Sequence, residues 1–318
     1  MIDVRTLAAP DTEGRTIPKD CDVIGILIGD SNAVGWESSL TLSEERRVLP
    51  DLPVKGAYMW GKWSARDVVT RYDTSGQGKW IPLSVGFGFP VGTHIGPEIS
   101  LGATRYAQLR PHAESKRTFR YGIVKVAAPG ALLTPDENPR GTWDPYHLSE
   151  HSLFSTLIER HLGPAIESVQ REGRRVLLDA VYMSVGSNDA RPSTELGARL
   201  QAARAALHDL VDALRKANGV PDLPVIATLP LEVPEYIELR ATFAIEKAFL
   251  DREERDEHFH AVSVKDLERQ YDRQHFTGLG QVGHGKRLAS VWEREVTRLR
   301  EPGIVDAKRA PVEEEPAT

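Results

Sequence analysis

Cysteine is almost absent from this chain: Cys21 is the single one among 318 residues. One cysteine excludes an intrachain disulfide framework and a zinc site built from cysteines. Because Cys21 directly precedes an apolar stretch, we expect a buried structural thiol rather than a reactive one. Long hydrophobic runs are missing as well, and no stretch approaches the roughly 20 apolar residues of a membrane span. Residues 1–20 contain acids and prolines but no apolar signal-peptide segment, so we expect a cytoplasmic protein.

A strong charge of either sign is also lacking. The formal net charge is -6, with 27% charged and 40% hydrophobic residues, as in ordinary globular proteins. This mild acidity gives no electrostatic reason to expect a nucleic acid or an anionic membrane as partner. The charge does not define a substrate, and the sequence leaves the oligomeric state open. The length allows a large core in one or two domains.

Short apolar runs alternate with longer segments of helical periodicity. The expected strands are 23–28, 119–126, 177–185, 224–229 and 259–264. The expected helices are 98–109, 149–171, 194–218, 235–257 and 279–299. This alternation predicts an α/β fold, with a parallel sheet of about five strands and helices on both faces.

Three segments fall outside this alternation. Residues 1–20 are interpreted as an N-terminal extension and 303–318 as a disordered acidic tail, leaving one domain at 21–302. Within the domain, 34–95 is a long aromatic-rich insertion with little periodicity. Its aromatic residues either cover an edge of the sheet or line a substrate cleft, and the two interpretations are equally weighted. The candidates for substrate contact are Trp36, Trp60 and Trp63.

Four separated segments carry residues suited to one chemistry. They are Gly29-Asp30-Ser31-Asn32, Pro129-Gly130, Gly186-Ser187-Asn188-Asp189 and Asp272-Arg273-Gln274-His275. A serine hydroxyl becomes a useful nucleophile when a histidine, itself oriented by a carboxylate, takes its proton. Each segment lies at or just past an expected strand end, where functional groups of parallel sheets gather. The pattern therefore favours a serine esterase.

Each segment also has a purely structural interpretation. Asp30 and Ser31 can cap a helix, and Asp272 with His275 can be a surface pair on a loop. Gly130 can be a turn glycine, or its N–H can approach an oxyanion closely. Asn188 can be an ordinary loop residue or an oxyanion donor. It is the combination of the four segments that favours the chemical interpretation.

The order and types of these residues resemble the SGNH (GDSL-type) hydrolase superfamily, named for Ser, Gly, Asn and His in separate blocks. Within it, the chain is most similar to carbohydrate acetylesterases grouped with sialic-acid-specific 9-O-acetylesterases, including carbohydrate esterase family six. That family's Gly-Gln-Ser-Asn-Met-x-Gly is matched by 29–35, its Gly-Pro-Glu by 96–98 and its Lys-x-Ala-x-Gly-like strand end by 125–130. Its Asp-x-x-His-Phe and following glycine-rich helix are matched by 272–289. The third block, 185–190, departs from the family's Gln-Gly-Glu-Ser-Asp-Ala. At Asn188 it has the asparagine that is typical of the broader superfamily.

The resemblance implies a flavodoxin-like three-layer sandwich with strand order 2-1-3-4-5. It also implies roles: Ser31 as nucleophile, His275 as general base and acid, and Asp272 as the residue that orients His275. The oxyanion hole would comprise the Ser31 N–H, the Gly130 N–H and the Asn188 amide. No cofactor and no metal are expected. The implied substrate is a small acyl ester, acetyl by likeness, of a carbohydrate or related hydroxylated metabolite.

Two other functions remain open at this point. The same triad would serve an acyltransferase, in which a sugar or metabolite hydroxyl replaces water as acceptor. A non-catalytic carbohydrate-binding relative is the other, although a binding module has no need of an activated nucleophile.

Overall fold

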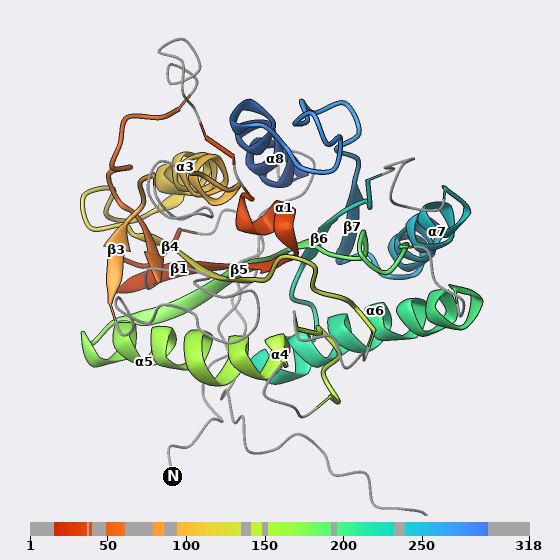
Figure 1. Ribbon diagram of the computed structural model, residues 1–318. Coiled ribbons are helices and arrows are strands. Elements are labelled where there is room, and N and C mark those ends of the chain that lie inside the picture. The colour runs from red at the N-terminus through yellow and green to blue at the C-terminus, as the bar shows by residue number, and fades with distance from the viewer. Residues whose placement is uncertain are drawn as a thin grey trace, which may run out of the picture.

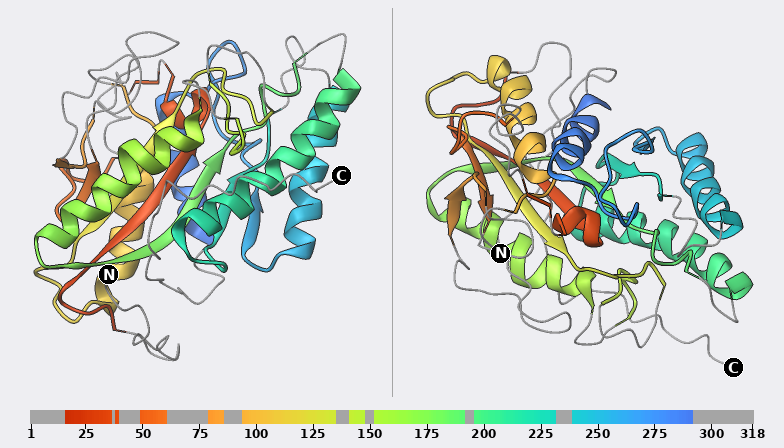
Figure 2. Two further views of the ribbon diagram at one scale, coloured as in Figure 1. Left: turned by 90° about the horizontal axis from the view of Figure 1, so that it is seen from below. Right: turned by 45° about the horizontal axis from the view of Figure 1, so that its top comes forward.

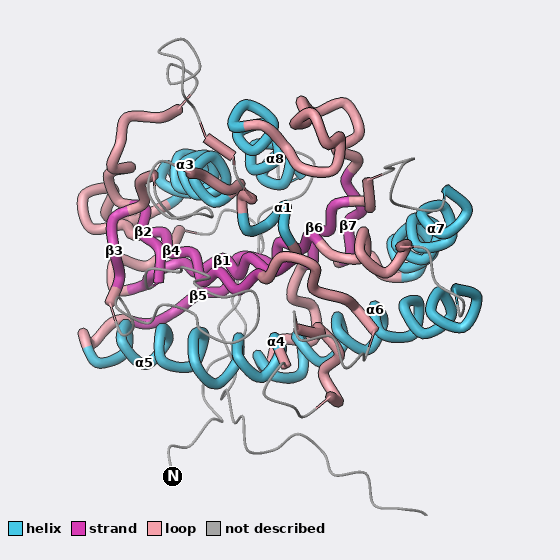
Figure 3. Tube along the Cα trace, in the orientation of Figure 1, coloured by secondary structure: helices cyan, strands magenta, loops and turns pink. Residues whose placement is uncertain are grey.

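The fold is organised around a seven-stranded sheet with the order β3-β2-β4-β1-β5-β6-β7 (Figures 1 and 3). The structure is a computed structural model and describes residues 16–36, 38–39, 49–60, 79–85, 94–134, 141–147, 152–191, 196–231 and 239–291. The strands are β1 (Cys21–Gly29), β2 (Ala57–Trp60), β3 (Trp80–Pro82), β4 (Tyr121–Ala127), β5 (Arg175–Ser184), β6 (Val225–Thr228) and β7 (Phe259–Val262). All neighbouring strands are parallel except β3, which is antiparallel to β2.

The middle of the sheet is formed by β1 between β4 and β5. Every residue of β1 and β4 is buried, as expected for strands covered on both faces. The register pairs Val23 with Tyr121 and Gly29 with Ala127, so β1 and β4 end at the same edge. The five predicted strands therefore exist, and their predicted order 2-1-3-4-5 is confirmed as β4-β1-β5-β6-β7. Cys21 opens β1 and is 1% exposed, which confirms the buried thiol.

Helices cover both faces of the sheet (Figures 1 and 2). One face carries α1 (Ser31–Val34), α3 (Glu98–Leu109) and α8 (Gly278–Ser290), with a short turn η1 (Arg110–His112) after α3. The other carries α4 (Leu153–Ser155), η2 (Thr156–Leu162), α5 (Gly163–Arg171), α6 (Leu196–Asn218) and α7 (Leu239–Arg255). A large apolar cluster fills the space between the sheet and this second group, and a smaller cluster lies under α3 and α8.

The helix predicted over 149–171 is not uniform. It begins at Leu153, and Thr156–Leu162 is a π-helical segment, with the Gly163 N–H bonding to the Ile158 carbonyl. Pro164 follows within the first turn of α5. A proline ring inside a helix clashes with the carbonyl four residues earlier, and a wider turn before it relieves that contact. The other predicted helices agree with α3, α6, α7 and α8 within a few residues, as far as they lie in the described part of the chain.

Two strands inside the 34–95 insertion were not predicted. β2 pairs with β4, and β3 adds a further strand at the edge of the sheet. Trp60 on β2 and Trp80 on β3 meet edge to face, with ring centroids 5.2 Å apart. The part of the insertion that forms β2 and β3 therefore adds two strands to the sheet, and two of its tryptophans pack against each other there.

Residues at the start of the described chain also join the fold. Ile17 is 3% exposed and pairs with the segment after η1, through hydrogen bonds to the His112 carbonyl and from the Glu114 N–H. The expected tail at 303–318 and residues 1–15 lie outside the described residues. In the part of the chain that the structure describes, no helix has the length and apolar character needed to cross a bilayer.

Candidate active site

Ser31 is the first residue of α1, directly after the turn that ends β1. The Asp30 side chain caps this short helix by accepting a hydrogen bond from the Asn32 N–H at 3.0 Å. Gly29 is required for the close packing of this turn, because a Cβ there would lie 2.4 Å from the Ser184 carbonyl oxygen and from the Ala33 Cβ. The helix then ends at Gly35 with a φ of 79°, a left-handed conformation that glycine adopts without strain. The local sequence therefore places the Ser31 hydroxyl at the carboxyl end of the central strand.

His275 is presented by a compact loop between β7 and α8. One carboxylate oxygen of Asp272 accepts hydrogen bonds from the backbone N–H groups of Gln274 at 2.9 Å and His275 at 3.0 Å. The other oxygen lies 2.6 Å from His275 Nδ1. Arg273 within this turn has a φ of 55°, uncommon for a residue other than glycine. Asp272 thus shapes the loop and orients the imidazole at the same time.

The structure brings these two segments together at the edge of the sheet. His275 Nε2 lies 3.0 Å from Ser31 Oγ, although 244 residues separate them in the sequence. Ser31, His275 and Asp272 thereby form a continuous chain of hydrogen bonds through the imidazole. The distances are those required for proton transfer from the hydroxyl to the ring. The Trp36 ring lies beside this arrangement, with its centroid 6.2 Å from that of the His275 ring.

The pKa values of two carboxyl groups are shifted in opposite directions. Partial burial disfavours the charged form of Asp272, but hydrogen bonds from the His275 and Gln274 groups outweigh it and lower its pKa. Asp272 is therefore an anion at neutral pH, as required to stabilise an imidazolium. Burial raises the pKa of Asp30 to about 7, despite the hydrogen bond from Asn32. Asp30 thus carries a proton in a large share of molecules at neutral pH.

Gly130 and Asn188 lie on the neighbouring loops that follow β4 and β5. Gly130 has a φ of 79° in a turn closed by the hydrogen bond from the Ala131 N–H to the Ala128 carbonyl. The Asn188 amide nitrogen donates to the Ala131 carbonyl at 3.1 Å and, at 3.4 Å, to Asp30. Asn188 therefore links the Gly130 turn to the residue that precedes Ser31. The two predicted oxyanion residues are adjacent to the Ser31 turn.

Several residues that support this edge were not identified as functional from the sequence. Asp189 is fully buried and accepts hydrogen bonds from the N–H groups of Leu133 and Thr134 and from the Thr134 hydroxyl, so it fastens the loop beyond Gly130. Its pKa is raised to about 6 by burial. The signal available in the sequence was its position beside Asn188.

A buried ion pair lies directly under α1. Lys125 on β4 donates to Glu98 at 2.9 Å and to the Val34 carbonyl at 3.1 Å. Glu98 in turn accepts from the Gly96 N–H at 2.9 Å. Both charged side chains have no exposed surface. The pair thereby connects β4 and the start of α3 to the end of the helix that carries Ser31.

The three tryptophans named as substrate contacts lie in different places. Trp36 lies beside His275, at the candidate site. Trp60 is 2% exposed and packs in the core against the sheet, which favours the packing interpretation for this residue. Trp63 lies outside the described residues.

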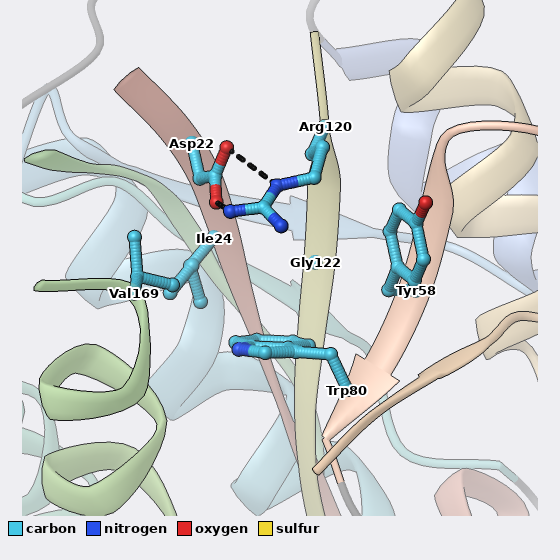
Figure 4. Close-up of a pocket in the computed structure, with 7 residues that line it drawn as sticks. All are labelled: Asp22, Ile24, Tyr58, Trp80, Arg120, Gly122 and Val169. Atoms are coloured by element: carbon cyan, nitrogen blue, oxygen red, sulfur yellow. Dashed lines mark hydrogen bonds and ion pairs between the residues drawn. The ribbon is translucent and has the colours of Figure 1, made fainter. Parts of the chain in front are cut away.

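A small pocket opens at the opposite edge of the sheet (Figure 4). The ion pair of Asp22 and Arg120, at the amino ends of β1 and β4, lies above the Trp80 ring. The pocket volume of about 20 Å³ holds about one water molecule. It is too small for a sugar, and it does not extend the candidate site.

Comparisons with known proteins place this geometry in context. No protein-family model matches the chain, and no curated protein matches it. Among solved structures, a protein from Arabidopsis thaliana is similar with a TM-score of 0.58 and 17% identity, over 86% of this chain and 98% of the other. The chain has an SGNH-like fold.

Two further solved structures are similar to this chain. XAC1771, a carbohydrate acetylesterase from Xanthomonas citri, matches with a TM-score of 0.53 and 13% identity over 86% of this chain, which spans 56% of that protein. NanS matches with a TM-score of 0.52 and 12% identity over 88% of this chain and 100% of the other. The resemblance inferred from the motifs is thus confirmed at the level of the SGNH-like fold.

Proposed function

We propose that this protein is a serine esterase that hydrolyses a small acyl ester, with acetyl as the preferred group. The observation that carries the proposal is the linear arrangement of Ser31, His275 and Asp272, with 3.0 Å and 2.6 Å separations on the two sides of the imidazole. A nucleophile, a base and an orienting carboxylate at these distances are the parts needed for acyl transfer to serine. A merely structural histidine needs no serine hydroxyl at its second nitrogen.

In the proposed reaction, Ser31 Oγ attacks the ester carbonyl while His275 Nε2 takes the hydroxyl proton. The imidazolium is stabilised by the Asp272 carboxylate at Nδ1. His275 then gives the proton to the departing alcohol, which leaves an acyl group on Ser31. A water molecule attacks this ester with His275 again as base, and the acid is released as Ser31 recovers its proton.

The negative oxygen of the tetrahedral intermediate would be held by the Ser31 N–H, the Gly130 N–H and the Asn188 amide. No described residue accepts a hydrogen bond from the Ser31 N–H. The Asn188 amide points toward Asp30, and a protonated Asp30 accepts a hydrogen bond less strongly than a carboxylate does. The raised pKa of Asp30 therefore favours a switch of that N–H hydrogen bond from Asp30 to the oxyanion.

A carbohydrate or a related hydroxylated metabolite is the proposed alcohol. The proposal draws on the motif resemblance, and on the described activity of XAC1771, which shares the fold. Trp36 beside His275 adds an aromatic surface on which a sugar ring can pack.

The deciding experiment is hydrolysis of p-nitrophenyl acetate, butyrate and octanoate by the wild-type protein and by Ser31→Ala. The proposal predicts hydrolysis with preference for acetate, and loss of turnover in Ser31→Ala with an unchanged circular dichroism spectrum. Equal rates in the two proteins would refute the assignment of Ser31. Adding an alcohol acceptor and analysing the products distinguishes hydrolysis from acyl transfer, and binding of a sugar without turnover would indicate a carbohydrate-binding protein.

A further inference from the structure

Asn32, the residue after Ser31, contacts the backbone on both sides of His275. Its amide nitrogen donates to the Gln274 carbonyl at 3.1 Å. Its amide oxygen accepts from the Phe276 N–H at 3.3 Å. One side chain therefore holds the two peptide groups that flank the imidazole-bearing residue. Asn32 itself is 4% exposed.

Asn32 is in turn fixed at its own backbone. Its N–H donates to the Asp30 side chain at 3.0 Å, and its carbonyl accepts from the Gln281 amide of α8 at 3.0 Å. Figure 1 shows α1 and α8 on the same face of the sheet. The side chain of Asn32 thus extends from an immobilised turn, next to the proposed nucleophile.

The Gln270 and Ser38 side chains also hold this loop. Gln270 donates to the Trp36 carbonyl at 2.8 Å and to the Phe276 carbonyl at 2.9 Å. The Ser38 hydroxyl donates to the Phe276 carbonyl at 2.7 Å. These bonds connect the loop to the segment after α1, whereas the Asn32 bonds connect it to α1 itself. Because Asn32 directly follows Ser31 in the chain, its two hydrogen bonds join the loop that carries His275 to the residue next to the proposed nucleophile.

We propose that Asn32 is a positioning residue that sets the distance and direction between His275 and Ser31. Asn32 makes no contact with substrate in this role and acts through the backbone of Gln274 and Phe276. Chain connectivity cannot supply the alignment, because 244 residues separate the two reacting side chains. A misplacement of about 1 Å can reduce a rate roughly 100-fold, so a clamp on both flanks of the base has a direct effect on turnover.

The proposal rests on the proposed esterase function, and its test uses two readouts. The first is a double-mutant cycle on p-nitrophenyl acetate with Asn32→Ala, His275→Ala and the double variant. Asn32→Ala alone should lower kcat roughly 100-fold with KM changed by less than about twofold. In the His275→Ala background it should cause no further loss, because no imidazole remains to be positioned.

Asn218→Ala is the matched control. Asn218 is also a buried asparagine that donates to a backbone carbonyl, that of Leu214, but it lies at the end of α6 at the opposite edge of the sheet. It should leave kcat unchanged. If Asn32→Ala does not fold, Asn32→Asp keeps the shape and places a carboxylate oxygen against the Gln274 carbonyl, and the same cycle is measured with that variant.

The second readout is amide hydrogen exchange of residues 270–277, which does not require activity. Asn32→Ala should accelerate exchange in this loop, and Asn218→Ala should not. Unchanged exchange, an unaltered kcat, or an equal loss in the His275→Ala background would each overturn the positioning role. Wild-type protein without Ser31-dependent hydrolysis, but with faster loop exchange in Asn32→Ala, would instead refute the esterase function and leave the clamp established.

Discussion

The buried pair of Lys125 and Glu98 makes a prediction about stability that can be worked out from the structure. Lys125→Met removes the cation and leaves the Glu98 carboxylate without exposed surface and with the Gly96 N–H as a remaining donor. Glu98→Gln leaves the ammonium with the Val34 carbonyl. Removing one partner of a buried ion pair lowers the free energy of unfolding by about 3–5 kcal/mol. Each single variant should fall in that range.

The double variant, Lys125→Met with Glu98→Gln, removes both charges and approximately preserves the volume of the two side chains. A buried pair replaced as a whole by side chains of similar size is often as stable as the original. Burial lowers the pKa of Lys125, and Glu98 offsets only part of that shift, so the charged state is already disfavoured. The double variant should therefore be more stable than either single variant.

Urea denaturation of the four proteins at pH 7 measures these differences by linear extrapolation. The reasoning would be refuted by single variants within about 1 kcal/mol of the wild type, or by a double variant that loses the sum of the two single effects. As a control, the free energy of unfolding should fall with urea concentration at the same slope in all four proteins, which shows that their unfolded states are comparable.

Three further predictions concern titrating groups. Asp272→Asn keeps an oxygen for the loop N–H groups but places an amide opposite His275 Nδ1, which favours the wrong tautomer of the imidazole. The kcat on p-nitrophenyl acetate should therefore fall roughly 100- to 10,000-fold with the fold retained. A rate near that of the wild type would remove Asp272 from the mechanism. Burial raises the pKa of Asp30 to about 7 from 3.8, so the wild type should lose stability as the pH rises from about 4 to 7. Asp30→Asn should lack this pH-dependent loss of stability when the two proteins are compared by urea denaturation. Burial lowers the pKa of His284 to about 3 from 6.5, so this group should lower stability as pH falls below about 6.5, by up to about 1.4 kcal/mol per pH unit. His284→Leu should show a shallower acid slope, and an unchanged slope would mean that the imidazole reaches solvent.

The sequence predicted the parallel part of the fold because its strands are buried on both faces. Val23–Ile28 is a continuous apolar run and β4 is interrupted only by Lys125, as a strand between two helical layers requires. The strands β2 and β3 were missed because they are short and form the last two strands at one side of the sheet. The four residues of β2 become a strand by pairing with β4, a tertiary contact that local propensity does not encode.

The candidate site was predictable in its reacting groups but not in its support. Few residue types can act as a nucleophile, a base or an orienting carboxylate. Such residues lie beyond strand ends at Ser31, Asp272 and His275, so their proximity in the fold could be anticipated. The Asn32 clamp could not, because its partners are backbone groups of Gln274 and Phe276, which any sequence offers at every position. Trp60 shows the opposite failure: an aromatic residue in an irregular insertion can be core or cleft, and here the strand pairing places it in the core.

The distance along the chain between Ser31 and His275 also has a consequence for synthesis on the ribosome. The strand that leads to Ser31 leaves the ribosome before the other described strands, whereas the loop with His275 follows all of them. A nascent chain can therefore form much of the sheet before the proposed base reaches the proposed nucleophile. On the proposed function, a fluorescent probe that reacts only with an activated serine would remain silent on chains stalled before His275. It would label chains in which the loop with His275 has joined the sheet.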